Sequence, residues 1–214
     1  TVSTNLTLTS GIVNTEIDLL TSAAVAGGSA SSYIQGPLAI TGATGTTIFP
    51  VGKSNYRPLT AVSITSAGSP TAQAEVFDTA PTQSFDGGLV RISQVRYFEV
   101  VLTGAALTGG NVTLSYGPDD GVQQFDVSGD VVVSISTDEG ASDPYSSIGG
   151  GATGTVPSGD VTSVDIGIVP TGSYYFTLGT VTGDNSLPVE LSSFAAKASF
   201  KEVVLNWMTY SELD

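Results

Sequence analysis

Apolar and polar positions alternate with a period of two in many short segments of this 214-residue chain. That period is typical of half-buried β-strands, because successive side chains of a strand point to opposite faces of its sheet. The alternation predicts strands at residues 59–66, 71–77, 95–102, 111–116, 131–137, 161–169 and 172–180. Turn residues separate these segments, and no helical periodicity lies between them. The pattern therefore predicts an all-β chain built around an antiparallel β-sandwich.

The first 31 residues contain two short alternating runs, VSTNLTLTSGIV and TEIDLLTSAAVAGG. Their separation is roughly that of successive solenoid coils, and the last coils of a parallel β-helix need only small and β-branched residues. Two runs do not establish a repeat, so an ordinary hairpin is an equal alternative. We expect a β-helix-like lead-in or a hairpin over residues 1–31 and a β-sandwich domain over residues 32–186.

Residues 187–214 predict the first two strands of a further module. Val203, Leu205 and Trp207 alternate with their neighbours, and residues 194–200 predict the strand before them. Two strands cannot bury a face that carries a tryptophan. We therefore expect the missing strands to come from chain beyond Asp214 or from another molecule. In the second case Val203, Leu205 and Trp207 would mark a self-assembly surface that adds a strand to another copy.

The amino-acid composition excludes several functional classes. The chain has 26 glycines and only 12% charged residues, as expected of a turn-rich β protein. It has no cysteine and no histidine. Disulfides, zinc sites of the usual kind and nucleophiles paired with histidine are thereby excluded. Carboxylate-bound calcium and carboxylate-pair glycosidases remain open.

The net charge of -14 is unevenly distributed, since no Lys or Arg lies between Arg96 and Lys197. Nucleic acid and anionic membrane surfaces need clustered basic residues to neutralise phosphates, so we expect neither as a partner. The chain has no apolar run of the length that a membrane helix requires, which predicts no membrane insertion. The acidity instead suits the solubility of an extracellular surface.

The densest carboxylate run follows Gly117 and contains Asp119, Asp120, Asp126 and Asp130. A tight turn flanked by glycine can present several oxygen ligands to Ca²⁺, and these four residues are the candidate metal ligands. The spacing lacks the glutamate at the twelfth position of an EF-hand loop. A solvated acidic turn is the simpler interpretation, and we expect no cofactor unless calcium binds here.

A second acidic group, Asp138, Glu139 and Asp143, borders the Gly-rich segment 140–159, which predicts a long exposed loop. A glycosidase needs one carboxyl whose pKa is raised inside a cleft, and loop acids in water lack this property. We therefore expect no enzymatic activity.

Three of the six basic residues form a group with two tyrosines, in which Arg57 and Arg96 each adjoin a tyrosine and Arg91 lies shortly before Arg96. The group consists of Tyr56, Arg57, Arg91, Arg96 and Tyr97. Aromatic faces and arginine hydrogen bonds could form a polysaccharide platform. We favour the alternative that the tyrosines pack in the core and that the arginines pair with acids such as Asp86 and Glu99.

Two sets of motifs resemble segments of very large extracellular surface proteins of Bacteroidetes. One set is an aromatic-x-x-Gly-Pro-Leu, a Phe-Pro-Val-Gly and a Tyr-Arg-Pro, found at residues 33–38, 49–52 and 56–58. The other is Leu-Pro-Val-Glu-Leu, a Phe, Val-x-Leu-x-Trp and Thr-x-Ser-Glu, found at residues 187–191, 194, 203–207 and 209–212. In that family the second set opens a fibronectin-type-III-like domain, so the resemblance implies strands A and B of such a module over residues 187–214.

The resemblance also implies an extracellular or cell-surface location and export through the type IX secretion system. Its implied partners are other copies of the chain or neighbouring domains of a longer one. We thus expect an extracellular structural module of a bacterial surface protein or fibre. Because the chain lacks clusters of basic residues, nucleic acid and anionic membranes are not among its expected partners. The alternatives are an adhesion module that depends on carbohydrate or calcium, and an accessory domain of a larger secreted enzyme.

Overall fold

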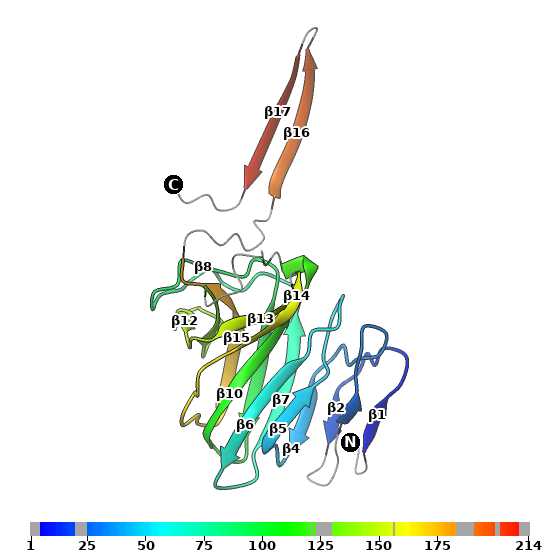
Figure 1. The fold of residues 1–214 in the computed structure, drawn as a ribbon, viewed down its shortest axis with the longest axis vertical. Coiled ribbons are helices and arrows are strands. Elements are labelled where there is room, and N and C mark those ends of the chain that lie inside the picture. Colours follow the sequence, from blue (N-terminus) through cyan, green and yellow to red (C-terminus); the bar gives the residue numbers. More distant parts are fainter. Residues whose placement is uncertain are drawn as a thin grey trace.

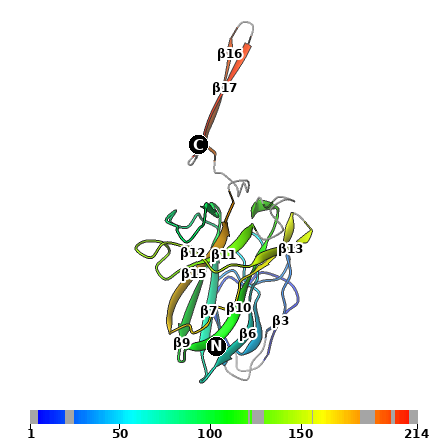
Figure 2. The same ribbon diagram turned by 60° about the vertical axis from the view of Figure 1, so that its left-hand side comes forward.

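The computed structural model describes residues 5–19, 25–120, 122, 130–155, 157–182, 191–199 and 202–209, the last two ranges as paired strands only. Two facing β-sheets make up the body of the molecule (Figure 1), so the predicted all-β sandwich is confirmed. Seen from the side, β9 and β15 lie in one layer and β6 and β10 in the other (Figure 2). Neither sheet closes into a barrel.

The larger sheet has eight strands. Their order is β12 (Ser146–Ser147), β11 (Val131–Ser136), β15 (Gly172–Thr180), β9 (Tyr97–Thr103), β7 (Thr71–Phe77), β4 (Leu38–Thr41) and β2 (Ile17–Leu19), and β8 (Arg91–Ile92) also pairs with β15. The smaller sheet has five strands. Their order is β13 (Gly151–Thr155), β14 (Ser158–Thr162), β10 (Leu107–Tyr116), β6 (Leu59–Ser66) and β5 (Gly45–Phe49). Each sheet takes strands from distant parts of the sequence, because the chain crosses repeatedly between the layers.

The core lies between the sheets and follows the alternation seen in the sequence. In β7, Ala72, Ala74 and Val76 are buried, while the residues between them are half-buried on the outer face. Strand β10 does the same from the opposite sheet, where Val112 and Leu114 point into the core. The outer face of the larger sheet carries a second, smaller apolar cluster beneath the segments that flank β8 and β12. It consists of Leu89, Ile92, Val132 and Tyr145.

The N-terminal strands pair in parallel, as stacked coils do, whereas the strands of a hairpin would be antiparallel. Strand β1 (Leu6–Leu8) pairs with β3 (Val25–Gly27), and β2 pairs with β4. Val13, Ile34 and Val51 also form two successive parallel bridges, with partners about 20 residues apart in the sequence. This ladder crosses residue 31, so the lead-in and the sandwich share hydrogen bonds.

Two of the expected segments differ from the structure. The predicted strand over residues 161–169 ends at Thr162, and residues 163–171 form a loop. There the Asp165 carboxylate accepts hydrogen bonds from the N–H groups of Gly110 and Gly167, at 3.1 and 2.8 Å, which draws the backbone out of the sheet.

The Gly-rich segment 140–159 is not one long exposed loop. It contains β12, β13 and the first residues of β14, and it begins beside the fully buried Tyr145. The ring of Tyr145 anchors the segment on the outer face of the larger sheet, and the small residues after it allow β13 and β14 to pair.

Strands β16 (Leu191–Ser199) and β17 (Glu202–Thr209) form an antiparallel hairpin. Their register places Phe194 opposite Trp207, Ala196 opposite Leu205, and Ala198 opposite Val203. Among the described strands, β16 and β17 pair only with each other.

The register of the core predicts unequal effects of two neighbouring substitutions in β10. Leu114→Ala removes a fully buried side chain between the sheets and should lower the free energy of unfolding by about 2 to 5 kcal/mol. Thr113→Ala removes a half-buried side chain on the outer face, whose hydroxyl forms a hydrogen bond with that of Thr162, and should cost less than about 1 kcal/mol. Urea denaturation measures both, and equal losses would contradict the assigned register.

Candidate functional site

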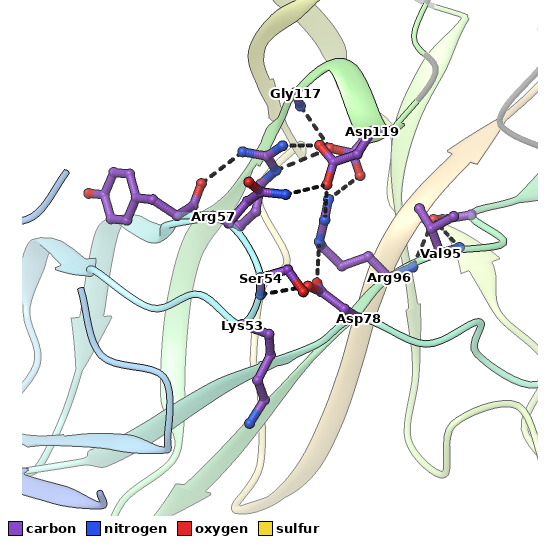
Figure 3. Close-up of polar contacts among 12 residues, drawn as sticks. Lys53, Ser54, Arg57, Asp78, Val95, Arg96, Gly117 and Asp119 are labelled. Atoms are coloured by element: carbon purple, nitrogen blue, oxygen red, sulfur yellow. Dashed lines mark hydrogen bonds and ion pairs between the residues drawn. The ribbon is translucent and has the colours of Figure 1, made fainter. Parts of the chain in front are cut away.

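Five charged side chains meet at one end of the sandwich, where the two sheets are joined. We call Arg57, Asp78, Arg96, Asp119 and Asp120 the ion-pair cluster (Figure 3). They come from four separate segments: the turn after β5, the turn after β7, the approach to β9, and the 3₁₀ turn η1 (Pro118–Asp120) that follows β10. The cluster therefore connects the two sheets through charged groups instead of apolar packing.

Arg96 is the centre of the cluster. Its Nε donates to Asp78 Oδ1 at 3.0 Å, one terminal nitrogen donates to Asp119 Oδ2 at 2.5 Å, and the other pairs with Asp120. Only 4% of the Arg96 side chain is exposed. Burial alone would lower the pKa of Arg96, but the negative charges of Asp120, Asp119 and Asp78 and a hydrogen bond to Asp119 raise it. Each of the three nitrogens of the guanidinium group thus has a carboxylate partner.

Asp120 is the most deeply buried acid of the cluster, with 2% of its side chain exposed. It forms ion pairs with Arg96 and with the Nε of Arg57, the latter at 3.3 Å, and it accepts a hydrogen bond from the backbone N–H of Gly117 at 2.7 Å. Burial raises the pKa of Asp120, while the positive charge of Arg96 and the N–H of Gly117 act against that rise. A buried carboxylate is stable only with such partners, because its desolvation costs several kcal/mol.

Asp119 lies at the rim of the cluster, where 36% of its side chain is exposed. It pairs with both arginines and accepts a hydrogen bond from the Asn55 amide at 3.1 Å. Its partial burial would raise its pKa, but hydrogen bonds and charge from Arg96 and Arg57 lower it below the ordinary value of 3.8. The carboxylate form is therefore favoured in the folded protein.

Two local features hold the arginines in place. Arg57 donates to the carbonyl of Tyr56 at 2.8 Å and passes so close to Gly117 that a β-carbon there would collide with its guanidinium group. Asp78 is fixed by the N–H of Ser54 at 2.8 Å. Gly117 is thus required for close approach of the backbone to a charged group.

The loop that carries Arg57 is itself positioned by the N-terminal ladder. Val51 is the last member of the parallel stack, and the next residue, Gly52, donates its N–H to the Ile34 carbonyl at 2.9 Å. The Lys53 carbonyl accepts the Tyr33 hydroxyl at 2.8 Å, and Lys53 pairs with Glu75 at 2.5 Å. Residues 33–34 and 51–53 therefore form the frame of this loop.

The structure unites two groups of residues that the sequence presented separately. Arg57 and Arg96 pair with acids, as expected, but their partners are Asp78, Asp119 and Asp120, so the expected partners Asp86 and Glu99 were wrong. Glu99 instead accepts the hydroxyl of Tyr175 at 3.2 Å. Arg91 forms no ion pair with any described residue.

The four candidate calcium ligands are not gathered in the described structure. Asp119 and Asp120 have their oxygens directed at guanidinium groups, and Asp130 lies outside the ion-pair cluster, just before β11. Asp126 falls outside the described residues. Within the described residues, no group of three or more metal-ligating side chains is suitably placed for a metal ion.

The second acidic group builds a turn. Asp138 accepts hydrogen bonds from the backbone N–H groups of Ser142 and Asp143, at 2.8 and 3.0 Å. Hydrogen bonds from Ser142 and from the Asp143 N–H lower the pKa of Asp138 to about 2. This is the environment of a structural carboxylate, opposite to the raised pKa of a catalytic acid.

The aromatic side chains give no open platform in the part of the chain whose burial is described, since none of them there is exposed. Tyr97 is buried, and its ring stacks on Phe77 with centroids 4.9 Å apart. Tyr56 is half-buried beside Tyr33. The expectation of core-packed tyrosines therefore holds for Tyr97, with Tyr56 at the edge.

Comparison with known proteins yields no relatives: no family model, no curated protein and no solved structure matches this chain. The residues that the sequence did not indicate are Asp78 and Asn55. The shortage of cations after Arg96 pointed to the acids of that stretch, such as Asp119 and Asp120, and no signal in the sequence indicated Asp78 or Asn55.

Removing the central arginine should strongly destabilise the fold. Arg96→Met keeps most of the side-chain volume but leaves Asp120 and Asp78 partly unpaired, and it should cost about 3 to 5 kcal/mol in the free energy of unfolding. Arg91→Met makes the same change of charge without breaking an ion pair and should cost less than about 1 kcal/mol. Similar losses in chemical denaturation would contradict the central role of Arg96.

The lowered pKa of Asp119 predicts a pH-dependent contribution to stability. Since its folded pKa lies below the ordinary 3.8, the contribution is present above that value and disappears as pH falls through the folded pKa. The free energy of unfolding of the wild type should exceed that of Asp119→Asn near neutral pH, and the gap should narrow in acid. Asp120 is present in both proteins, and only the part of its raised pKa that comes from the charge of Asp119 differs between them. A gap that widens in acid would refute the assignment.

Proposed function

We propose that this chain is a structural module of an extracellular bacterial surface protein or fibre, and that its C-terminal hairpin links it to a neighbouring β-domain. The observation that carries the proposal is the hairpin β16–β17, whose outer edges have no partner among the described strands. Its register puts Phe194 beside Trp207 and Ala196 beside Leu205. Two strands cannot bury such residues, and open strand edges readily accept further strands.

The way the chain leaves the sandwich suits a linking role. Strand β15 precedes the hairpin and pairs on both sides, with β9 and with β11. Near its end the Thr177 hydroxyl donates to the Arg96 carbonyl at 2.7 Å, which connects β15 to the ion-pair cluster. A pull on the end of β15 would therefore act on many hydrogen bonds at once.

The remaining features agree with a structural role. The absence of cysteine and histidine removes the commonest nucleophilic and metal chemistry. The carboxylates around Arg57, Arg96 and Asp138 stabilise loops through ion pairs and hydrogen bonds. Among the described residues, no helix is long and apolar enough to cross a membrane. The resemblance to Bacteroidetes surface proteins supports an extracellular location and type IX export as part of the same proposal.

Self-assembly is the testable form of this proposal. The purified chain should form larger species as its concentration rises, because a head-to-tail contact between hairpin and sheet edge does not close on itself. Deleting residues 187–214 should abolish these species, as measured by light scattering and electron microscopy. In the full chain, Leu205→Ser should weaken assembly more than Val204→Ser, which alters the alternate face of the same strand.

Two outcomes would count against self-assembly. Fibres that persist unchanged without residues 187–214 would exclude the hairpin as the linking element. A full chain that stays monomeric at high concentration would exclude assembly between copies and would confine the linking role to neighbouring domains of a longer chain.

A further inference from the structure

An apolar cavity of about 50 Å³ lies between the two sheets, at the end of the core next to loop 163–171. Both sheets contribute to its wall, among others through Phe49, Ile64, Ala72 and Leu102. Ile166 and Val169 of the loop complete it. This space is separate from the ion-pair cluster.

The cavity lies beside a local irregularity in the smaller sheet. The pairing of β6 with β10 shifts register at Gly109 and between Gly109 and Asn111, and Ser63 adopts a φ of 55° there. Position 110 requires glycine, because its φ is 144° and a β-carbon there would lie 2.6 Å from the Cδ1 atom of Ile64. The bulge thus interrupts the regular pairing of β6 with β10 beside Ile64 and Leu107, two residues of the cavity wall.

The wall determines what the cavity can hold. Every lining residue is Ala, Val, Leu, Ile, Phe or Tyr. The only polar side-chain group among them is the Tyr174 hydroxyl, which donates to the Pro170 carbonyl at 2.9 Å. A buried water needs two to four polar partners, so a space of this kind stays dry although its volume exceeds the roughly 10–15 Å³ that a water requires. An empty apolar space also forfeits dispersion contacts that a polarisable guest restores.

One side of the wall is a loop instead of a strand. Several hydrogen bonds hold residues 163–171 there. The Ile166 N–H donates to the Gly110 carbonyl at 2.8 Å, and Leu107 and Val169 exchange two backbone hydrogen bonds, at 2.9 and 3.1 Å. Ile168, between the two lining residues, is 76% exposed. A small guest would reach the cavity from solvent through transient local opening of this loop.

We infer that this cavity is a binding site for small uncharged apolar ligands, from the size of a xenon atom to that of a short alkyl group. Charged or hydrogen-bonding ligands are excluded, because the wall offers no partner for a polar group. The inference rests on the core alone and is independent of the proposed assembly through the hairpin.

Methyl NMR under xenon pressure tests the inference directly. In the wild type, the methyl resonances of Ile64, Leu107 and Val169 should shift with xenon pressure and approach saturation, while methyls of the second apolar cluster should not. Ala72→Val adds two carbons to the cavity wall and should abolish the shifts. Ala74→Val is the matched control, because it lies on the same face of β7 but does not line the cavity, and it should retain the shifts.

Thermal melting gives an independent measure. Ala72→Val should leave the melting temperature unchanged or raise it, since the added carbons enter empty space, whereas Ala74→Val should lower it by several degrees through overpacking. Ala61→Val, at another lining position, repeats the test should Ala72→Val fail to fold. Absent shifts in the wild type, or shifts that Ala72→Val and Ala61→Val leave unchanged, would overturn the inference.

Discussion

The pairing of Arg96 with Asp120 is the contact on which the architecture of this end of the molecule depends. Both side chains are almost completely buried, and neither charge would be tolerated there without the other. Because Arg96 precedes β9 of the larger sheet and Asp120 follows β10 of the smaller one, the pair connects the two sheets at this end of the sandwich. Apolar packing tolerates small shifts, but a buried guanidinium with three carboxylate partners does not.

The requirement extends outward from the cluster to the N-terminal residues. Arg57 must reach Asp119 and Asp120 from the turn after β5, and that turn starts from Val51, the last member of the parallel ladder. The N-terminal lead-in therefore also positions Arg57 in the ion-pair cluster. The same end of the sandwich contacts β15 through Thr177, so the ladder, the cluster and the strand that leads to the hairpin form one connected structure.

Much of the fold could be predicted from alternation, and most of the site could not. Strands β6, β7 and β15 were located by their pattern, because burial on one face imposes a period of two. The prediction of an exposed loop over the Gly-rich segment 140–159 was wrong, because its strands consist of small residues and depend on Tyr145 beneath them. For the site, the arginines and the acidic turn were both recognised, but their mutual pairing was not. Asp78 and Asp120 lie far apart in the sequence, and no local pattern indicates that they share one cation.

The sequence by itself determined that this is an all-β chain, that histidine and cysteine chemistry is closed to it, and that its acids outnumber its cations. These properties follow from composition and from the near-neighbour pattern, which require no knowledge of the fold. Only the tertiary structure decided that β1 pairs with β3 and β2 with β4 in parallel, which carboxylates pair with Arg57 and Arg96, and that a cavity lies beside the bulge at Gly110. Each of these depends on contacts between distant segments, where register, burial and charge must be satisfied together.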